Sequence, residues 1–258
     1  MKNIFGIIAL CLGTLLSTFS QAKETQIITD RPDAAEASVT VGQWKFQSEH
    51  GVSFGYDNPA GPSVKNYSFP TLLRFGILDP LEIRLETEIA AIQSSGGNTE
   101  SGFTDFDLGA KWHLHDQAEF FPSLGLLFHL TIPVGKDAFS SNVVVPTFKV
   151  LADWELPADF GLGTNAGFDV PAREGGDKFA RFLYAAALSH GLFIEPLAGF
   201  VEFSGSLPTV SGKTQEHFFD AGFTWLFGKS IQADISGQIG LNDDAQDFAL
   251  GTGVSILW

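Results

Sequence analysis

Charged side chains recur at every second position within an apolar stretch of this sequence. In Leu81–Ala90, LEIRLETEIA, charges stand at Glu82, Arg84, Glu86 and Glu88, and the positions between them are apolar or threonine. Charges at this spacing share one face of a strand, because successive side chains of a strand point to opposite faces. Such a row can form ion pairs that fill an enclosed interior, or it can present charges to a polar solute.

The same alternation places titratable residues opposite the apolar face in many other segments. We interpret them as the interior lining of a barrel, serving either as an ion-pairing network or as an acid-rich, cation-favouring path or solute-binding ladder. The candidate lining residues are Glu49, Arg74, Glu82, Arg84, Glu86, Glu88, Asp105, Asp107, Lys111, His113, His129, Lys149, Asp153, Asp169, Asp220 and Asp234.

Other chemistry finds little support in the sequence. His113 and His115 are two residues apart, which places them on one face of a strand, but two ligands from one strand are a weak metal signal. The acid-rich segment 242–247, NDDAQD, lacks the ligand spacing of an EF-hand and is typical of an exposed hairpin. No serine, histidine and acid come together in the strand pattern. We therefore predict no metal, no cofactor and no enzymatic activity.

The first 22 residues have the pattern of a secretory signal peptide. Lys2 precedes an apolar run over Ile4–Leu16, and Ser20-Gln21-Ala22 resembles a small-x-small cleavage site. The only cysteine, Cys11, lies in this segment, so we expect neither disulfides nor thiol chemistry after cleavage.

The remainder of the chain is acidic and rich in glycine and phenylalanine. Removing the signal removes one lysine and no acid, which leaves 14 basic and 30 acidic residues and a net charge of −16. This balance argues against nucleic acid or an anionic surface as a partner. No later apolar run is long enough for a transmembrane helix, and the composition favours strands over helices.

From Val41 onward, alternating segments predict twelve strands joined by connections that are alternately long and short. We therefore expect residues 41–258 to form an all-β, up-and-down antiparallel transmembrane β-barrel of about twelve strands. A β-sandwich is the competing architecture for an exported chain of this composition, but its Greek-key connections have no reason to alternate in length. The two strands placed near 179–189 and 192–203 have no clear facing.

All five tryptophans fall on the apolar face and near the same end of the predicted strands. An indole is favoured at the boundary between lipid and water, so we predict a membrane-interface belt on the periplasmic side. The belt residues are Trp44, Trp112, Trp154, Trp225 and Trp258.

Residues 23–40 precede the strands and show no periodic pattern. The segment carries Asp30, Arg31 and Asp33 within TDRPD. One interpretation is a solvated periplasmic tail. Our hypothesis is that it folds into the lumen, pairs with wall charges such as Arg74 and Glu82, and acts as a plug or gate.

Several segments resemble a known family. TDRPDAAEAS, PTLLRFGILDPLEIRLE, GFTDFDLGAKW and PSLGLLFHLTIPVGKD are similar to the outer-membrane family named for a MetA-pathway of phenol degradation, over Thr29 to the C-terminus. The resemblance implies a barrel that transports small organic compounds, aromatic ones among them. The C-terminal Trp258 is also similar to the end signal that barrel-assembly machinery reads in such proteins.

These observations predict a monomer in the bacterial outer membrane, surrounded by lipid and lipopolysaccharide. We expect passive or facilitated passage of a small-molecule solute through a charged lumen. The alternative is a closed structural barrel whose extracellular loops interact with other molecules.

Overall fold

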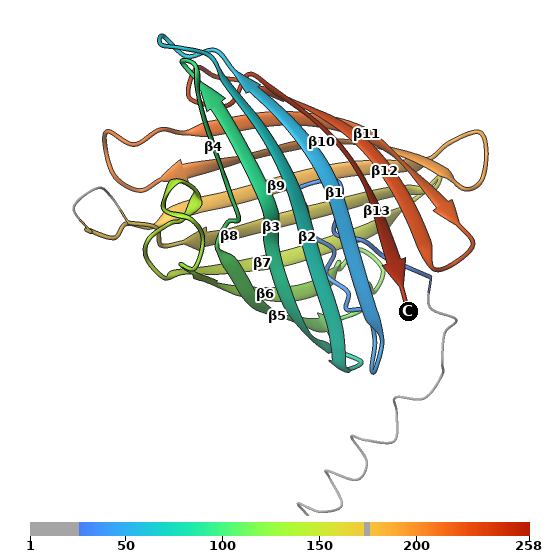
Figure 1. Cartoon of the computed structure of the whole chain (residues 1–258). Coiled ribbons are helices and arrows are strands. Elements are labelled where there is room, and N and C mark those ends of the chain that lie inside the picture. Colours follow the sequence, from blue (N-terminus) through green and yellow to red (C-terminus); the bar gives the residue numbers. More distant parts are fainter. Residues whose placement is uncertain (1–25, 173–175) are drawn as a thin grey trace, which may run out of the picture.

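The computed structural model describes residues 26–172 and 176–258, and within them the chain forms one antiparallel sheet that closes on itself (Figure 1). The predicted signal peptide and Cys11 lie outside the described residues. The strands are β1 (Phe46–Asp57), β2 (Val64–Leu78), β3 (Leu81–Ser95), β4 (Asn98–Gly102), β5 (Phe106–His115), β6 (Ser123–Ile132), β7 (Val145–Leu156), β8 (Phe160–Asp169), β9 (Arg181–Gly191), β10 (Leu197–Pro208), β11 (Glu216–Phe227), β12 (Ile231–Gly240) and β13 (Phe248–Leu257), with a 3₁₀ turn at Asp137–Phe139.

Strand β1 closes the ring by pairing with β2 on one side and with β13 on the other. Gln47, for example, lies opposite Arg74 of β2 and Leu257 of β13. Of the thirteen described strands, β4 pairs only with β3, which leaves twelve in the ring, in up-and-down order. Closure gives every ring strand two partners and removes the exposed edges that an open sheet would present. The predicted fold class is confirmed.

The outer face of the ring is apolar. Ile83, Leu108, Phe128 and Leu250 point outward, and Ile235 on β12 is 59% exposed. An apolar surface that runs around a whole molecule is unfavourable in water and favourable in the hydrocarbon core of a bilayer. The fold is therefore that of an outer-membrane β-barrel.

The two rims differ in the length of their connections. At one rim, two residues join β2 to β3 and three join β7 to β8 and β11 to β12. At the other rim, the connections include residues 133–144 and 209–215. The C-terminus lies at the short-turn rim, opposite the β3–β4 hairpin (Figure 1). No helix among residues 26–172 and 176–258 is long and apolar enough to cross a bilayer.

Three local expectations were wrong. The strand expected from Leu192 begins at Leu197, because residues 192–196 form a turn in which Leu192 donates to the Leu197 carbonyl. The Gly-rich segment 93–102, QSSGGNTESG, was expected to be one of the long connections, but it forms a hairpin with Gly96 and Gly97 at the positive φ angles of its tip. Strand β1 starts at Phe46 and not near Val41.

The structure also separates the two histidines that the alternation placed on one face. The register of β5 against β6 shifts between His113 and His115. His113 bonds the backbone carbonyl of Ser38, whereas the His115 ring packs on Phe121 at 5.3 Å. Among the described residues, no group of three or more histidine, cysteine or acidic side chains is placed to hold a metal ion.

Candidate functional site

The segment ahead of β1, residues 26–45, folds into the ring of strands and returns to the rim where it entered (Figure 1); we call it the arm. Its first limb is fixed at the short-turn rim, where the Ile27 amide donates to the Lys229 carbonyl at 2.8 Å. Ile27 packs there against Val41, on the second limb, and against Leu257. These apolar contacts place both limbs at the same rim, so the residues between them form a loop inside the barrel.

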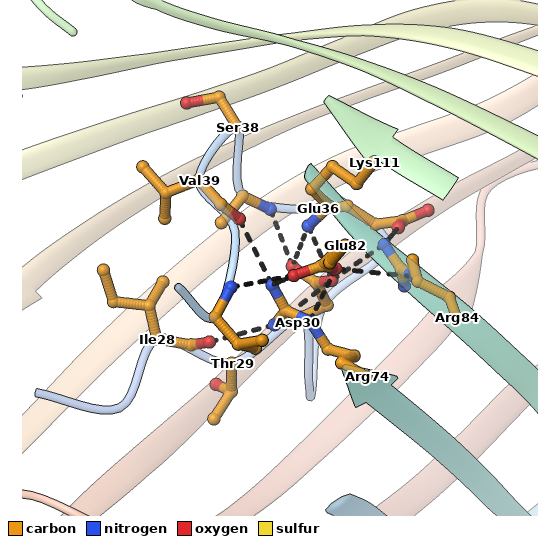
Figure 2. A network of polar contacts seen from close by, with 12 residues as sticks. Ile28, Thr29, Asp30, Glu36, Ser38, Val39, Arg74, Glu82, Arg84 and Lys111 are labelled. Carbon is orange, nitrogen blue, oxygen red and sulfur yellow. Dashed lines mark hydrogen bonds and ion pairs between the residues drawn. The ribbon is translucent and has the colours of Figure 1, made fainter. Parts of the chain in front are cut away.

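Asp30 lies at the centre of the contacts between the arm and the wall (Figure 2). Its carboxylate is 2.8 Å from Nζ of Lys111, 3.0 Å from Nη1 of Arg84 and 3.5 Å from Nη1 of Arg74. Burial by itself raises the pKa of Asp30, but Arg74, Lys111 and Arg84 outweigh it and hold the pKa at about 2. Asp30 is therefore an ionised anchor that joins β2, β3 and β5.

Arg74 on β2 holds both limbs of the arm. Its Nη1 donates to the Ile28 carbonyl at 3.0 Å, and its Nη2 donates to the Val39 carbonyl at 3.2 Å (Figure 2). The same guanidinium bonds Glu82 at 2.8 Å and Glu49 at 3.2 Å. Arg74 is buried, so these acceptors satisfy a cation that water cannot reach.

Two further arm residues form ion pairs with distant strands. Glu36 bonds Arg84 at 2.6 Å and Lys149 at 2.8 Å. Burial raises the pKa of Glu36, but these two cations hold it well below its usual range. Arg31 pairs with Asp234 of β12 at 3.1 Å.

The arm meets β6, β7 and β10 through backbone amides and small side chains. Glu202 accepts from the Ala34 amide at 2.7 Å, and Asp153 accepts from the Ser38 amide at 2.6 Å. The hydroxyls of Ser38 and Ser123 are 2.7 Å apart. Within residues 26–172 and 176–258, no lysine or arginine pairs with Asp33, and burial together with Glu202 raises its pKa well above the usual range.

Two cavities border the arm. The long-loop cavity, about 550 Å³, lies toward the long connections and is bordered by residues including Glu86, Asp107 and His129. The short-turn cavity, about 660 Å³, lies toward the other rim and is bordered by residues including Thr29 and Trp154. Asp33 borders both cavities, so this part of the arm stands between them.

The structure places the sequence-predicted residues on the inner side of the barrel, where their side chains differ in how far they are buried. Those that are buried are Glu49, Arg74, Glu82, Arg84, Asp105, Lys111, His129, Asp169, Asp220 and Asp234. Those that are partly buried are Glu86, Glu88, Asp107, His113, Lys149 and Asp153.

Only some of these residues meet the arm. Asp105 instead accepts from the backbone amides of Gly135 and Ser141 in a long connection, and Asp169 pairs with Arg181 at 2.5 Å. The structure also brings in Glu36 and Glu202, which the sequence interpretation missed. Glu202 is the single charged residue in β10, and it would have been predicted to lie on the inner face if the facing of that strand had been assigned.

The tryptophans lie at the short-turn ends of their strands. Trp44, Trp112 and Trp258 are exposed, Trp225 is 37% exposed, and the partly buried Trp154 donates from Nε1 to the Phe120 carbonyl at 3.2 Å. Their service as a membrane-interface belt stays a prediction.

A Gly-x-Ser-x-Gly spacing occurs at Gly51–Gly55, but Ser53 lies within β1, paired with Ser68 and Gly251. The nucleophilic serine of that motif stands on a sharp turn between a strand and a helix. Ser53 lies inside a strand, so it does not have the position of such a nucleophile.

The fold has counterparts among solved structures. An outer membrane channel from Pseudomonas putida F1 is 14% identical over 93% of this chain and 100% of its own, with a TM-score of 0.59. The NanC porin is 13% identical over 80% and 98%, with a TM-score of 0.55. The translocator domain of the autotransporter NalP from Neisseria meningitidis is 11% identical over 82% and 87%, with a TM-score of 0.54. At these identities the likeness concerns the fold alone.

No curated protein sequence matches the chain. The profile of one protein family, however, matches residues 29–258, which include the inner part of the arm and every strand of the ring. The chain therefore belongs to the family described as "Putative MetA-pathway of phenol degradation".

Proposed function

We propose that this protein is an outer-membrane channel for small solutes and that the arm is its gate. The observation that carries the proposal is the position of the arm between two cavities inside one barrel. A solute that crosses from the long-loop rim to the short-turn rim has to pass the residues around Asp33. Movement of the arm would therefore control passage.

The contacts of the arm support a gate that is held firmly at one side. Asp30, Arg31 and Glu36 are ion-paired with the wall, and these pairs involve β2, β3, β5, β7 and β12. Toward β10 the arm is held by the hydrogen bond from the Ala34 amide to Glu202, and no lysine or arginine among the described residues forms an ion pair with Asp33. We infer that the segment around Asp33 moves first, because it has the weaker attachment.

The proposed cargo is a small organic solute, and the description of the family points to aromatic compounds. The wall supplies charges of both signs, with more acids than bases, so passage would favour solutes with a cationic or hydrogen-bonding group. No cofactor takes part in this mechanism. We expect the barrel to act as a monomer, and we expect assembly machinery to recognise Trp258, which is 70% exposed at the short-turn rim.

A sealed barrel with functional loops is the second candidate, and one observation favours it. The side chains of Arg74, Glu49 and Glu82 are completely buried, which is expected of a permanent filling as well as of a closed gate. Conductance separates the two functions.

The Ser38–Ser123 contact allows a direct test. Hydroxyls 2.7 Å apart can be replaced by cysteines at disulfide distance, and the only natural cysteine, Cys11, lies in the predicted signal peptide. In planar bilayers, the oxidised S38C/S123C protein should stay in its lowest conductance state, and dithiothreitol should restore opening steps. The matched controls are the two single-cysteine variants, on which the reductant should have no effect. If neither form of the double variant nor the wild-type protein conducts, the channel function is wrong and the sealed barrel stands.

A further inference from the structure

Two rows of side chains lie next to each other on the wall of the long-loop cavity. Glu86 of β3 is opposite Asp107 of β5, and we call this pair the acidic row. Two residues away along β3, Arg84 is opposite Gly109, which in turn is opposite His129 of β6. We call Arg84 and His129 the basic row. The strand rise of about 3.3 Å per residue separates the two rows by about 7 Å.

Gly109 allows the basic row to form. A Cβ added at this position would lie 2.0 Å from Cδ2 and 2.6 Å from Nε2 of His129. The histidine ring therefore occupies the space that a side chain of β5 would fill, and it lies toward the strand that carries Arg84. A larger residue at position 109 would keep His129 away from this part of the cavity.

The acidic row has no cation of its own. Within the described part of the chain, no ion pair joins Glu86 or Asp107 to a lysine, arginine or histidine, although Asp107 accepts a hydrogen bond from Thr131. The nearest cations direct their charge elsewhere, because Nη1 of Arg84 and Nζ of Lys149 both pair with Glu36 and not with the acidic row. Two carboxyl groups side by side on one wall favour a positively charged ligand group.

The basic row has unfilled hydrogen-bonding capacity. Nε2 of His129 is buried and has no partner, and the residue is only 7% exposed although it borders the cavity. Nε of Arg84 is also buried without a hydrogen bond, 4.0 Å from Glu82. Buried polar atoms are nearly always hydrogen-bonded in folded proteins, so an unpartnered one at the wall of a cavity points to a ligand.

We propose that the long-loop cavity binds a small zwitterionic solute, whose ammonium group contacts the acidic row and whose carboxylate contacts the basic row. This inference rests on the proposed channel function, since it names the solute class that the channel would admit. A cavity of about 550 Å³ has the size of a small-ligand site. A purely cationic amine would satisfy only the acidic row, and a simple carboxylate would satisfy only the basic row.

Three probes of equal chain length test the assignment by calorimetry on the folded full-length protein in detergent. We expect 4-aminobutyrate to bind about tenfold more tightly than either butylamine or butyrate. The double variant E86Q/D107N should lose this preference, with 4-aminobutyrate binding weakened about tenfold. The matched control is D220N, because Asp220 is also a buried interior acid but does not border this cavity.

Binding of butylamine or butyrate as tight as that of 4-aminobutyrate would overturn the proposal, as would equal weakening by D220N. The comparison of probes on the wild-type protein decides the question even if E86Q/D107N does not fold, which heat-modifiable migration on a gel would reveal. Passage of a neutral sugar, arabinose, into proteoliposomes separates the two proposals. If arabinose enters but 4-aminobutyrate does not bind, only the solute class is wrong. If arabinose does not enter through the reduced S38C/S123C protein, the channel function itself fails.

Discussion

The carboxylate of Asp30 lies 2.8 Å from Nζ of Lys111, and both side chains are buried inside the barrel. Asp30 belongs to the arm and Lys111 to β5, so one ion pair connects the segment in the lumen to the wall. A buried charge is tolerated only while its partner is in place, so removal of either residue should destabilise the barrel.

Replacing Lys111 with methionine should leave Asp30 with one cation fewer. We expect the free energy of unfolding to fall by about 3 kcal/mol, because removal of one partner exposes the other to an uncompensated burial cost. Urea unfolding in lipid vesicles, followed by tryptophan fluorescence, measures the change. The control is K136M, since Lys136 pairs with Glu100 at 2.7 Å on the exposed surface and should lose less than about 1 kcal/mol. Equal losses would show that the buried network does not stabilise the barrel.

Docking of the arm should depend on pH in two opposite ways. The pKa of Asp30 is lowered from 3.8 to about 2, so its stabilising contribution is complete above pH 3.8 and is lost as the pH falls toward 2. The pKa of Asp33 is raised well above 3.8, so ionisation of this group disfavours docking, and docking weakens as the pH rises from 3.8.

Channel recordings across this range should therefore show the opening probability lowest at mildly acid pH and higher at neutral pH. The variant D33N should remove the rise toward neutral pH, and the change below pH 3.8 should remain. The variant D137N, in an exposed long connection, serves as the control. It should keep both the change below pH 3.8 and the rise in opening probability toward neutral pH. An unaltered rise in D33N would assign the pH dependence to another group.

Gly51 should be a position where a side chain loosens the arm without unfolding the barrel. A Cβ at Gly51 would lie 2.6 Å from the Arg31 guanidinium, which is the mobile end of a long side chain. In G51V we expect Arg31 to leave Asp234 and the frequency of channel opening to increase, with heat-modifiable migration unchanged. Gly61 has no atom within 4 Å of an added Cβ, so G61V should behave like the wild-type protein. If G51V opens no more often than G61V, the Arg31–Asp234 pair does not hold the arm.

A charge on the outer face should be costly only where that face meets the hydrocarbon core. Ile235 lies in the middle of β12 and is 59% exposed. The I235R substitution should therefore lower the free energy of unfolding in vesicles by about 2–4 kcal/mol. Leu241 is also exposed but follows the end of β12, and L241R should cost about 0–1 kcal/mol. Equal costs would place the membrane boundary elsewhere on the barrel.

Local patterning was sufficient for most of the fold. Glu82 and Arg84 could be assigned to the inner face because strand periodicity is a property of neighbouring residues, and the exposed Ile83 between them agrees. In β10 the same reasoning failed, since the apolar Phe200 is buried beside Glu202 while Val201 points outward, so apolar residues occupy both faces. The start of β1 was also misjudged, because Gly42 and Trp44 take positive φ angles that interrupt an otherwise alternating segment.

Sequence periodicity alone thus predicted a closed barrel and the side of the wall on which most charges stand. The partners of those charges were decided only by the tertiary structure. Arg31 and Asp234 are 203 residues apart, and Asp30 and Lys111 are 81 residues apart. Such contacts arise when ring closure and the entry of an aperiodic segment bring distant strands to one point. Alternation specifies which face a residue occupies, but it carries no information about what lies across the lumen.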